Sequence, residues 1–399
     1  MTRSPTPPAI PAPARPLPDD RTGPAGALPD GSDGIALIKP AVRAQAAYTL
    51  RAPPARRKLN QNECPLDLPP ALKRAILDEV LAAPWQRYPE FVPAELLERL
   101  AAHYRWRADG MLAGNGSNEL IQATLSVSLG AGDAVVAPSP TFSLYRLLTG
   151  VLGGRYVAVS LGANFEYDVD RLIGSAVRER ARVIVLNSPN NPTGSALPAG
   201  AVERILRETE ALVVCDEAYA EFGGPSAIPL LARSSRLVVL RTFSKAMGMA
   251  GLRFGVALAH PEVAAELAKG KLPYNVNLVT LAAAAAALRD APLFAERTRQ
   301  IVATRDRFLA RLATVPGITV YPTAANFVLF RCHAVPARDV FHRLYDEHGI
   351  LVRDVSNAAE LAECLRISVG TDDDMDAVLV AMAEIFGNCR TTEGTDGRG

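Results

Sequence analysis

The chain contains Arg241-Thr-Phe-Ser-Lys-Ala-Met-Gly-Met-Ala-Gly-Leu-Arg253, a segment that directly follows an apolar, strand-like run. Lys245 in this segment can attack an aldehyde only as the neutral amine, a form that burial and a cationic neighbour such as Arg253 both favour. Ser244 and Arg253 offer donors to a phosphate, and the small residues of the turn let the backbone approach a flat ligand. A nucleophilic lysine beside a phosphate site indicates pyridoxal phosphate as the cofactor.

The composition is that of a large globular enzyme. Of the 399 residues, 49% are hydrophobic and 21% are charged, which allows a large core and predicts two domains. The formal net charge is only +1, and no basic cluster is interleaved with aromatic residues. We therefore expect neither nucleic acid nor an anionic membrane as a partner, but small, locally charged substrates.

Cysteine usage and the chain ends bear on the compartment. The five cysteines are odd in number, far apart and in no CxxC pair, which argues against a disulfide framework or a zinc site and predicts a reducing cytoplasm. No run approaches the ~18 consecutive apolar residues of a membrane span. The closest run, 278–288, is expected to be a buried helix. Residues 1–34 are rich in proline, glycine and aspartate, so we expect a disordered tail rather than a signal peptide.

Two groups of strand-like runs predict the architecture. From about residue 110 to 258, short β-branched runs alternate with helical patterns, which is typical of a largely parallel sheet covered by helices. Residues 261–312 are expected to be mainly helical, and the second group follows them. The first group comprises 133–137, 155–159, 182–186, 212–215, 237–240 and 254–258; the second, assigned to a smaller α+β domain, comprises 318–321, 327–330, 350–353 and 365–369.

A glycine-rich motif opens one of the expected helices. It reads Gly114-Asn-Gly-Ser-Asn-Glu119. The amides of Gly116, Ser117 and Asn118 are candidates for binding phosphate oxygens at the positive end of that helix. The same motif also suits a helix that is merely capped by Ser117 or Asn115, and the sequence alone leaves both interpretations open.

Further motifs follow expected strands, at the edge where open parallel sheets bind ligands. Asp216 ends an apolar run, and a carboxylate there would keep a pyridine nitrogen protonated, so that the ring accepts electrons released at the substrate's α carbon. Phe142 offers an aromatic face for stacking on the ring. Asn191 lies in a turn after another run, and Tyr219 lies three residues beyond Asp216. An ordinary turn, or a helix cap with a packed tyrosine, is the alternative at these positions.

Together these motifs resemble those of the histidinol-phosphate aminotransferases, within the wider class of fold-type I pyridoxal-phosphate aminotransferases. The resemblance extends from about residue 35 to 386. Besides the lysine segment, it rests on Leu59-Asn-Gln-Asn-Glu-Cys-Pro65, Tyr88-Pro-Glu90, Asn187-Ser-Pro-Asn-Asn-Pro-Thr-Gly194, Asp216-Glu-Ala-Tyr219 and Leu365-Arg-Ile-Ser-Val-Gly370.

The resemblance implies an α/β fold, with a mostly parallel seven-stranded sheet in a large domain and a smaller α+β C-terminal domain. Residues 35–84 would form an N-terminal arm or part of the small domain. The large cofactor-binding domain would span 85–285 and the small domain 286–388, and a second disordered tail would occupy 389–399.

Each matching residue inherits an implied role. Lys245 would be the covalent anchor of the cofactor and the proton shuttle, and Asp216 the partner of the ring nitrogen. Asn191 and Tyr219 would bind the ring's 3′ oxygen. The residues implied to hold the cofactor phosphate are Ser117, Asn118, Ser244 and Arg253. A tyrosine from the neighbouring subunit reaches this site in the family, and Tyr88 matches it, so a homodimer is expected.

Substrate recognition would depend on guanidinium groups, because each can bind two oxygens of an anion at once. Arg366 and Arg353 match family arginines near the substrate's anionic groups, and Tyr48 and Asn62 are further candidate contacts. Histidinol phosphate has no carboxylate, so the division of its phosphate and the glutamate carboxylates between the two arginines stays open here. A lone arginine on a strand is more often part of a surface ion pair.

The implied reaction is a ping-pong transamination between histidinol phosphate with imidazole acetol phosphate and glutamate with 2-oxoglutarate, as in histidine biosynthesis. Three departures from the family pattern exist: Phe142 stands where tyrosine is usual, Asn118 where an acid is common, and the proline-rich tail is extra. An aromatic aminotransferase, a threonine-phosphate decarboxylase and a non-catalytic ligand sensor are the alternatives.

Overall fold

The computed structural model describes residues 31–47 and 53–387. The chain consists of two compact units, Met1–Ala46 and Ala47–Gly399. The described part of the first forms two short helices, α1 (Ser32–Ala36) and α2 (Pro40–Arg43), which bury no residue. Helix α1 begins inside the segment 1–34 predicted to be a tail. The second unit holds every sheet and the candidate site; the domain boundaries predicted within it, at 85 and 286, stay predictions.

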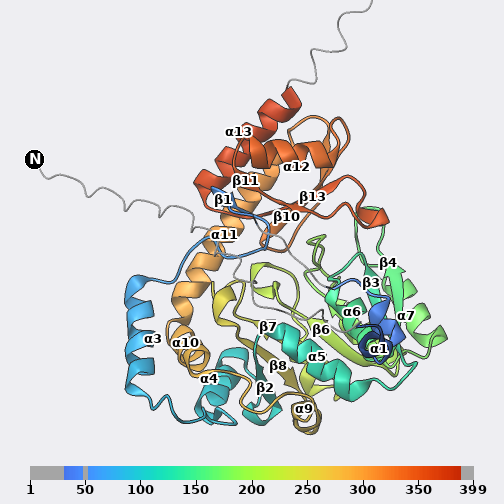
Figure 1. Cartoon of the computed structure of the whole chain (residues 1–399), viewed down its shortest axis with the longest axis vertical. Coiled ribbons are helices and arrows are strands. Elements are labelled where there is room, and N and C mark those ends of the chain that lie inside the picture. The colour runs from blue at the N-terminus through green and yellow to red at the C-terminus, as the bar shows by residue number, and fades with distance from the viewer. Residues whose placement is uncertain (1–30, 48–52, 388–399) are drawn as a thin grey trace, which may run out of the picture. The chain divides into compact units, whose positions relative to one another are not determined.

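The large sheet has seven strands in the order β2-β8-β7-β6-β5-β3-β4 (Figure 1). All run parallel except β8, which is antiparallel to both of its neighbours. The strands are β2 (Met111–Gly114), β3 (Ala134–Ser139), β4 (Arg155–Ser160), β5 (Val183–Asn187), β6 (Leu212–Asp216), β7 (Leu237–Thr242) and β8 (Gly255–Ala259). The predicted mostly parallel, seven-stranded sheet is confirmed. The strand that the sequence did not reveal is β2, whose four residues are too few to show a pattern.

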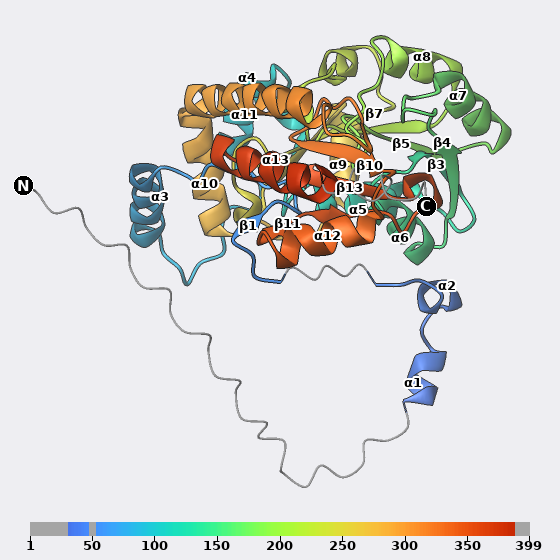
Figure 2. The same cartoon turned by 90° about the horizontal axis from the view of Figure 1, so that it is seen from above.

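Helices cover both faces of this sheet, because successive residues of a strand point to opposite sides. On β5, Val183 and Val185 pack against one set of helices, whereas Ile184 and Leu186 pack against the other. Figure 2 shows α7 and α8 on one side of the strands and α6 on the other. The first set is α5 (Ser117–Ser128), α6 (Leu144–Val151) and α9 (Pro261–Ala268); the second is α3 (Pro70–Ala82), α4 (Ala94–Tyr104), α7 (Val169–Arg178), α8 (Ala201–Glu208) and α10 (Leu278–Arg289).

The C-terminal part forms a second, antiparallel sheet of four strands in the order β12-β13-β10-β9. Helices α11 (Ala291–Leu312), α12 (Ala337–Asp346) and α13 (Asp372–Gly387) pack with it around a core that includes Phe327, Phe330 and Met382. Its strands are β9 (Ile318–Val320), β10 (Phe327–Cys332), β12 (Arg353–Asp354) and β13 (Cys364–Ser368). This agrees with the α+β pattern expected for the C-terminal strands.

The single strand predicted at 350–353 is wrong in one respect. Residues Ile350–Leu351 form β11, which pairs in parallel with β1 (Arg57–Lys58), whereas β12 pairs with β13. The chain changes sheet at Val352, which is fully buried between the two pairings. As a result Arg353 lies directly opposite Arg366 in the ladder.

Within the described residues, no single helix is long and apolar enough to cross a membrane. Helices α10 and α11 pass that test only as a pair, which is bent by 81° at the junction. The alanines of α10 are buried in the core of the large sheet, so the buried helix predicted at 278–288 is confirmed.

Candidate active site

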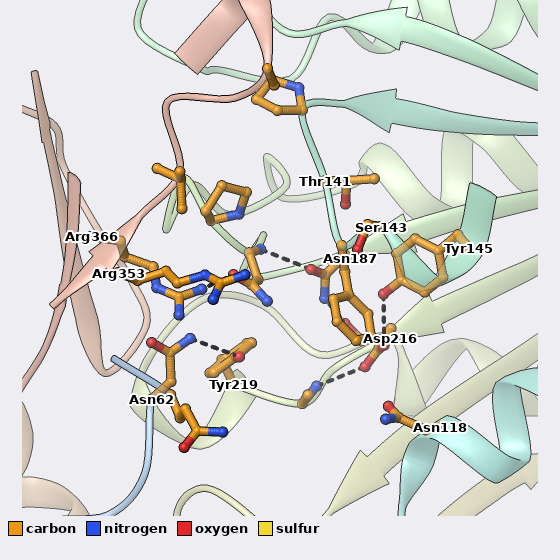
Figure 3. A pocket seen from close by; sticks show the side chains of 18 of the residues that line it. Asn62, Asn118, Thr141, Ser143, Tyr145, Asn187, Asp216, Tyr219, Arg353 and Arg366 are labelled. Carbon is orange, nitrogen blue, oxygen red and sulfur yellow. Dashed lines mark hydrogen bonds between the residues drawn. The ribbon is translucent and has the colours of Figure 1, made fainter. Parts of the chain in front are cut away.

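A cavity of about 670 Å³ lies at the carboxyl ends of the central strands. Asn187 at the end of β5 and Asp216 at the end of β6 form part of one wall, and the C-terminal sheet supplies Arg353 and Arg366 to the other. Figure 3 shows these two arginines reaching into the cavity toward the side chains at the strand ends. The predicted site residues that line it are Asn62, Ser117, Asn118, Phe142, Asn191, Asp216, Tyr219, Ser244, Lys245, Arg253, Arg353 and Arg366.

Lys245 lies in the turn after β7, with its ammonium directed into this cavity. Its Nζ donates a hydrogen bond to the backbone oxygen of Gln61 at 3.0 Å. Burial, and after it the charge of Arg366, lowers the pKa of Lys245 to about 7, against an opposing effect of Glu63. Arg253, the cation named from the sequence, contributes less than Arg366 does. Close to half of these amines are therefore neutral at pH 7, which is the form that can act as a nucleophile or a base.

Asp216 is 3% exposed and accepts two hydrogen bonds from the protein. The hydroxyl of Tyr145 donates to Oδ2 at 2.7 Å, and the amide of Ala218 donates to Oδ1 at 3.2 Å. Burial raises the pKa of the Asp216 carboxyl, while the hydrogen bond from Tyr145 and the charge of Lys245 oppose that rise. The result is a carboxylate held at the cavity wall by fixed donors, not a helix cap.

Two polar side chains lie between the strand ends and the arginines. The amide of Asn62 donates from Nδ2 to the Tyr219 hydroxyl at 3.0 Å. The Oδ1 atom of Asn191 accepts a hydrogen bond from Nη1 of Arg366, so the Asn191 NH₂ group remains a donor. Tyr219 is also within 5.7 Å, ring centroid to Nζ, of Lys245. The Asn191 amide and the Tyr219 phenol thus lie near Lys245, where they could bind a polar substituent on the ring of a ligand.

The N-terminus of α5 and the lysine turn form a second polar corner. Gly116 occupies the N-cap position of α5 with φ 81°, and no side chain accepts a hydrogen bond there. The alternative of a helix capped by Ser117 or Asn115 is therefore wrong, and the amides of the first turn stay available to an anion. Arg253 lies beside them and donates from Nη1 to Ser244 Oγ at 3.2 Å.

Arg366 and Arg353 form the cationic end of the cavity. Arg366 is 7% exposed, donates from Nη2 to the backbone oxygen of Asn60 at 2.8 Å and places its guanidinium 5.2 Å from the ring centre of Phe327. Arg353 is less buried. Two planar cations side by side suit a ligand with a multivalent anionic group.

Two predicted residues do not line the cavity. Tyr88 is 79% exposed and stacks on Tyr274, with the ring centres 4.5 Å apart. Gly116 lies just outside the lining, beside Arg253. Tyr48, a further predicted contact, lies outside the described residues.

Sequence reasoning missed residues that act through others. Asn187 donates from Nδ2 to the backbone oxygen of Asp216 at 3.1 Å and accepts the amide hydrogen of Asn191 at 2.8 Å, so it fixes two site residues together. Tyr145, three positions after Phe142, belongs to the same group. Both residues lie close in the sequence to predicted site residues, and this proximity was the available signal. A sequence does not show in which direction a side chain points.

Comparison with known proteins identifies the family of this chain. A family model described as aminotransferase class I and II matches residues 57–382. The chain belongs to the class I and II aminotransferases. This aminotransferase is 38% identical over 357 residues to the histidinol-phosphate aminotransferase of Chlorobium phaeovibrioides, which covers 89% of the chain and 98% of the relative. It is 38% identical over 349 residues to that of Chlorobaculum parvum, covering 87% and 98%.

A solved structure agrees with these relatives. The histidinol-phosphate aminotransferase from Sinorhizobium meliloti in complex with pyridoxal-5′-phosphate aligns with a TM-score of 0.80 at 27% identity, covering 88% of this chain and 98% of that one. The aminotransferase thus has the fold-type I architecture and uses pyridoxal phosphate.

The described residues fit this cofactor. A Cβ atom at Gly116 would lie 2.4 Å from Arg253 Nη2, so glycine leaves the guanidinium room beside the helix terminus. A Cβ atom at Gly255 would lie 2.5 Å from the amide nitrogen of Ser117, so only glycine lets β8 pass this close to the start of α5. The polar corner that results offers amides and a guanidinium to a phosphate, and Figure 3 shows Asn118 of this corner on the far side of the site from Arg366.

The lowered pKa of Lys245 predicts an unusual pH dependence. In cofactor-free protein, cyanate should carbamoylate Lys245 at a rate that rises with pH through about 7 and then levels off, because only the neutral amine reacts. In the unfolded chain the same rate should continue to rise toward about 10. Arg366→Gln should move the folded-state midpoint upward, since it removes a cation that disfavours the ammonium.

Peptide mass spectrometry across a pH series measures both rates. A midpoint for the folded wild type that coincides with that of the unfolded chain would contradict the assignment of Lys245 as the activated amine.

Proposed function

We propose that this aminotransferase is a histidinol-phosphate aminotransferase, which exchanges an amino group between histidinol phosphate and 2-oxoglutarate. The observation that carries the proposal is the pair Arg353 and Arg366, neighbours across β12 and β13 that line the cavity together. A phosphate monoester carries nearly two charges and three acceptor oxygens, which two guanidiniums can share. Curated relatives at 38% identity bear the same name.

The roles of Lys245 and Asp216 follow from their protonation states. When bound, pyridoxal phosphate supplies an aldehyde carbon that exchanges amine partners and a protonated ring that accepts the electrons released at the substrate's α carbon. Lys245 is the residue that would hold the cofactor covalently through that carbon. When a substrate amine takes its place, the neutral Nζ of Lys245 would take the proton from the substrate's α carbon and return it at C4′. Asp216 holds the proton on the ring nitrogen.

The remaining site residues orient the ligands. Asn191 and Tyr219 are assigned to the 3′ oxygen of the ring, because the amide keeps a donor and the phenol lies beside Lys245. Phe142 stacks on the ring. The cofactor phosphate is assigned to the helix terminus and its neighbours: Gly116, Ser117, Asn118, Ser244 and Arg253.

The two arginines divide the substrate's charge. Arg366 is the more buried of the two, and its charge acts on Lys245. We assign to it, in both half-reactions, the anionic group that lies nearest to the reacting carbon of the substrate. Arg353 adds a second cation where that group is a phosphate. Asn62, which lines the cavity and is hydrogen-bonded to Tyr219, is assigned as a further substrate contact.

We further propose a homodimer in which Tyr88 reaches the partner's cofactor phosphate. In its own chain Tyr88 is far from full burial, and it lies among other exposed apolar residues: Trp85, Phe91, Val92 and Leu272. Exposed aromatic clusters of this kind are typical of protein interfaces. A cytoplasmic location, which cell fractionation would test, agrees with the unpaired cysteines among the described residues.

The function is tested by supplying the enzyme separately with histidinol phosphate, phenylalanine and threonine phosphate while recording the cofactor spectrum and carbon dioxide release. Histidinol phosphate should aminate the cofactor fastest. Lys245→Ala should abolish turnover and change the cofactor absorbance, whereas Lys269→Ala, at a lysine whose side chain is 68% exposed, should leave both intact.

Other outcomes identify the alternatives. Faster reaction with phenylalanine would favour an aromatic aminotransferase, and carbon dioxide from threonine phosphate a decarboxylase. Sequence-specific DNA binding without turnover would favour a ligand sensor.

Arginine variants test the division of charge. Arg366→Gln should lower kcat/KM for histidinol phosphate and for glutamate by about tenfold to a hundredfold, the range for losing a charge-assisted hydrogen bond. Arg353→Gln should raise KM about tenfold for histidinol phosphate and much less for glutamate. Steady-state kinetics of each half-reaction gives the comparison; equal losses on both substrates in the Arg353 variant would overturn the division.

Sedimentation at micromolar concentration should give the mass of two chains. Tyr88→Phe should then weaken cofactor binding although Tyr88 does not line the candidate site of its own chain, because one phosphate donor from the partner is lost. A monomer that binds the cofactor normally would refute this arrangement.

A further inference from the structure

Tyr145 lies behind the candidate ring site, on the first turn of α6. It has no exposed surface, and its hydroxyl oxygen lies 2.7 Å from Oδ2 of Asp216. Figure 3 shows the phenol aimed at that carboxylate. The ring of Phe142 meets the ring of Tyr145 edge to face, with centres 5.6 Å apart. The same short stretch of chain therefore delivers both the stacking ring and a donor to the acid.

The direction of this hydrogen bond is fixed by chemistry. Burial, with the nearby charge of Asp216, raises the pKa of Tyr145 well above its usual value, so the phenol stays protonated and can only donate to a carboxylate. Donation to the ionised form of an acid favours that form. It opposes the effect of burial, which favours the protonated acid.

Among the described residues, the cation that acts on Asp216 is Lys245, which faces it from the turn after β7. Tyr167, before α7, and Tyr219 are phenols nearby. Cys215 precedes Asp216 on β6, and Glu217 directly follows the end of that strand. Glu217 is turned away to Arg241, at 2.6 Å. Because Lys245 carries its charge only part of the time near pH 7, the ionisation of Asp216 depends largely on hydrogen-bond donors.

We propose that Tyr145 is a positioning residue that keeps Asp216 ionised and correctly turned before the cofactor binds. With Oδ2 held by the phenol and Oδ1 by the amide of Ala218, the plane of the carboxylate is fixed from the protein side. The lone pairs that remain are free to accept the N–H of a protonated ring. Tyr145 is among the residues that line the cavity, but in this role it acts through Asp216. The inference rests on the proposed assignment of Asp216 to the ring nitrogen.

The sign of the expected pH effect follows from the loss of a donor. Tyr145→Phe keeps the ring but removes the contribution that lowers the pKa of Asp216, so that pKa rises further. As pH falls, the variant's carboxyl takes up a proton earlier than the wild type's and stops accepting from the ring nitrogen. Cofactor affinity should therefore be lost at a higher pH in the variant.

The experiment measures the dissociation constant of pyridoxal phosphate from cofactor-free protein between about pH 5.5 and 8.5. The ratio of variant to wild type should grow as pH falls and reach about tenfold or more. Tyr167→Phe is the matched control. It also loses one buried phenol donor, but the acceptor is the neutral backbone oxygen of Asn187, so any loss of affinity should be the same at every pH.

Two further measurements isolate the route through Asp216. In an Asp216→Asn background, Tyr145→Phe should produce no pH-dependent difference. With 1-deazapyridoxal phosphate, in which carbon replaces the ring nitrogen, the difference between wild type and Tyr145→Phe should also disappear. If the cofactor-free variant does not fold, release of the cofactor from holoenzyme during dialysis gives the same comparison.

Parallel affinity curves for wild type and Tyr145→Phe, or an equal pH effect with the deaza analogue, would overturn the proposal and leave Tyr145 a packing residue. A wild type that does not bind pyridoxal phosphate would instead refute the assignment of the site itself. Neither outcome depends on which amino compound is the substrate.

Discussion

Burial of ionisable groups at the floor of one cavity is the constraint on which the site depends. Low solvation disfavours the charged form of both Lys245 and Asp216, but the surrounding groups act on the two residues differently. In the part of the chain that the structure describes, the hydrogen-bond acceptor of the lysine is the backbone oxygen of Gln61, and the charge of Arg366 helps the lysine to lose its proton. The aspartate receives two donors. A neutral nucleophile and an anionic acceptor therefore coexist within one buried site.

The sheet topology makes this arrangement possible. Parallel strands end at one edge, so β5, β6 and β7 present Asn187, Asp216 and the lysine turn to the same space. Arg366 comes from a different sheet, and its hydrogen bond to Asn191 joins the two. The geometry of the reacting groups thus depends on a contact between residues that are far apart in the sequence.

Much of this could be predicted, and the exceptions have physical reasons. Apolar strands that are followed by polar residues are recognisable in a sequence. Six strands of the large sheet, and Lys245, Asp216 and Asn191, were therefore predicted from the sequence. The break at Val352 was missed, since four consecutive strand-like residues carry no mark of a change in sheet. Tyr145 and Asn187 were missed because their importance lies in the direction of a hydroxyl and an amide. The dominance of Arg366 over Arg253 at Lys245 is likewise a matter of distance in space.

The change of sheet at Val352 has an electrostatic consequence. It sets Arg353 against Arg366 across the β12-β13 ladder, and like charges in that position repel. This repulsion opposes the pairing of β12 with β13, and an anion bound between the two guanidiniums would offset it. Relief of this repulsion contributes to the affinity for a dianion. Dissolved salt screens the two cations and so reduces that contribution.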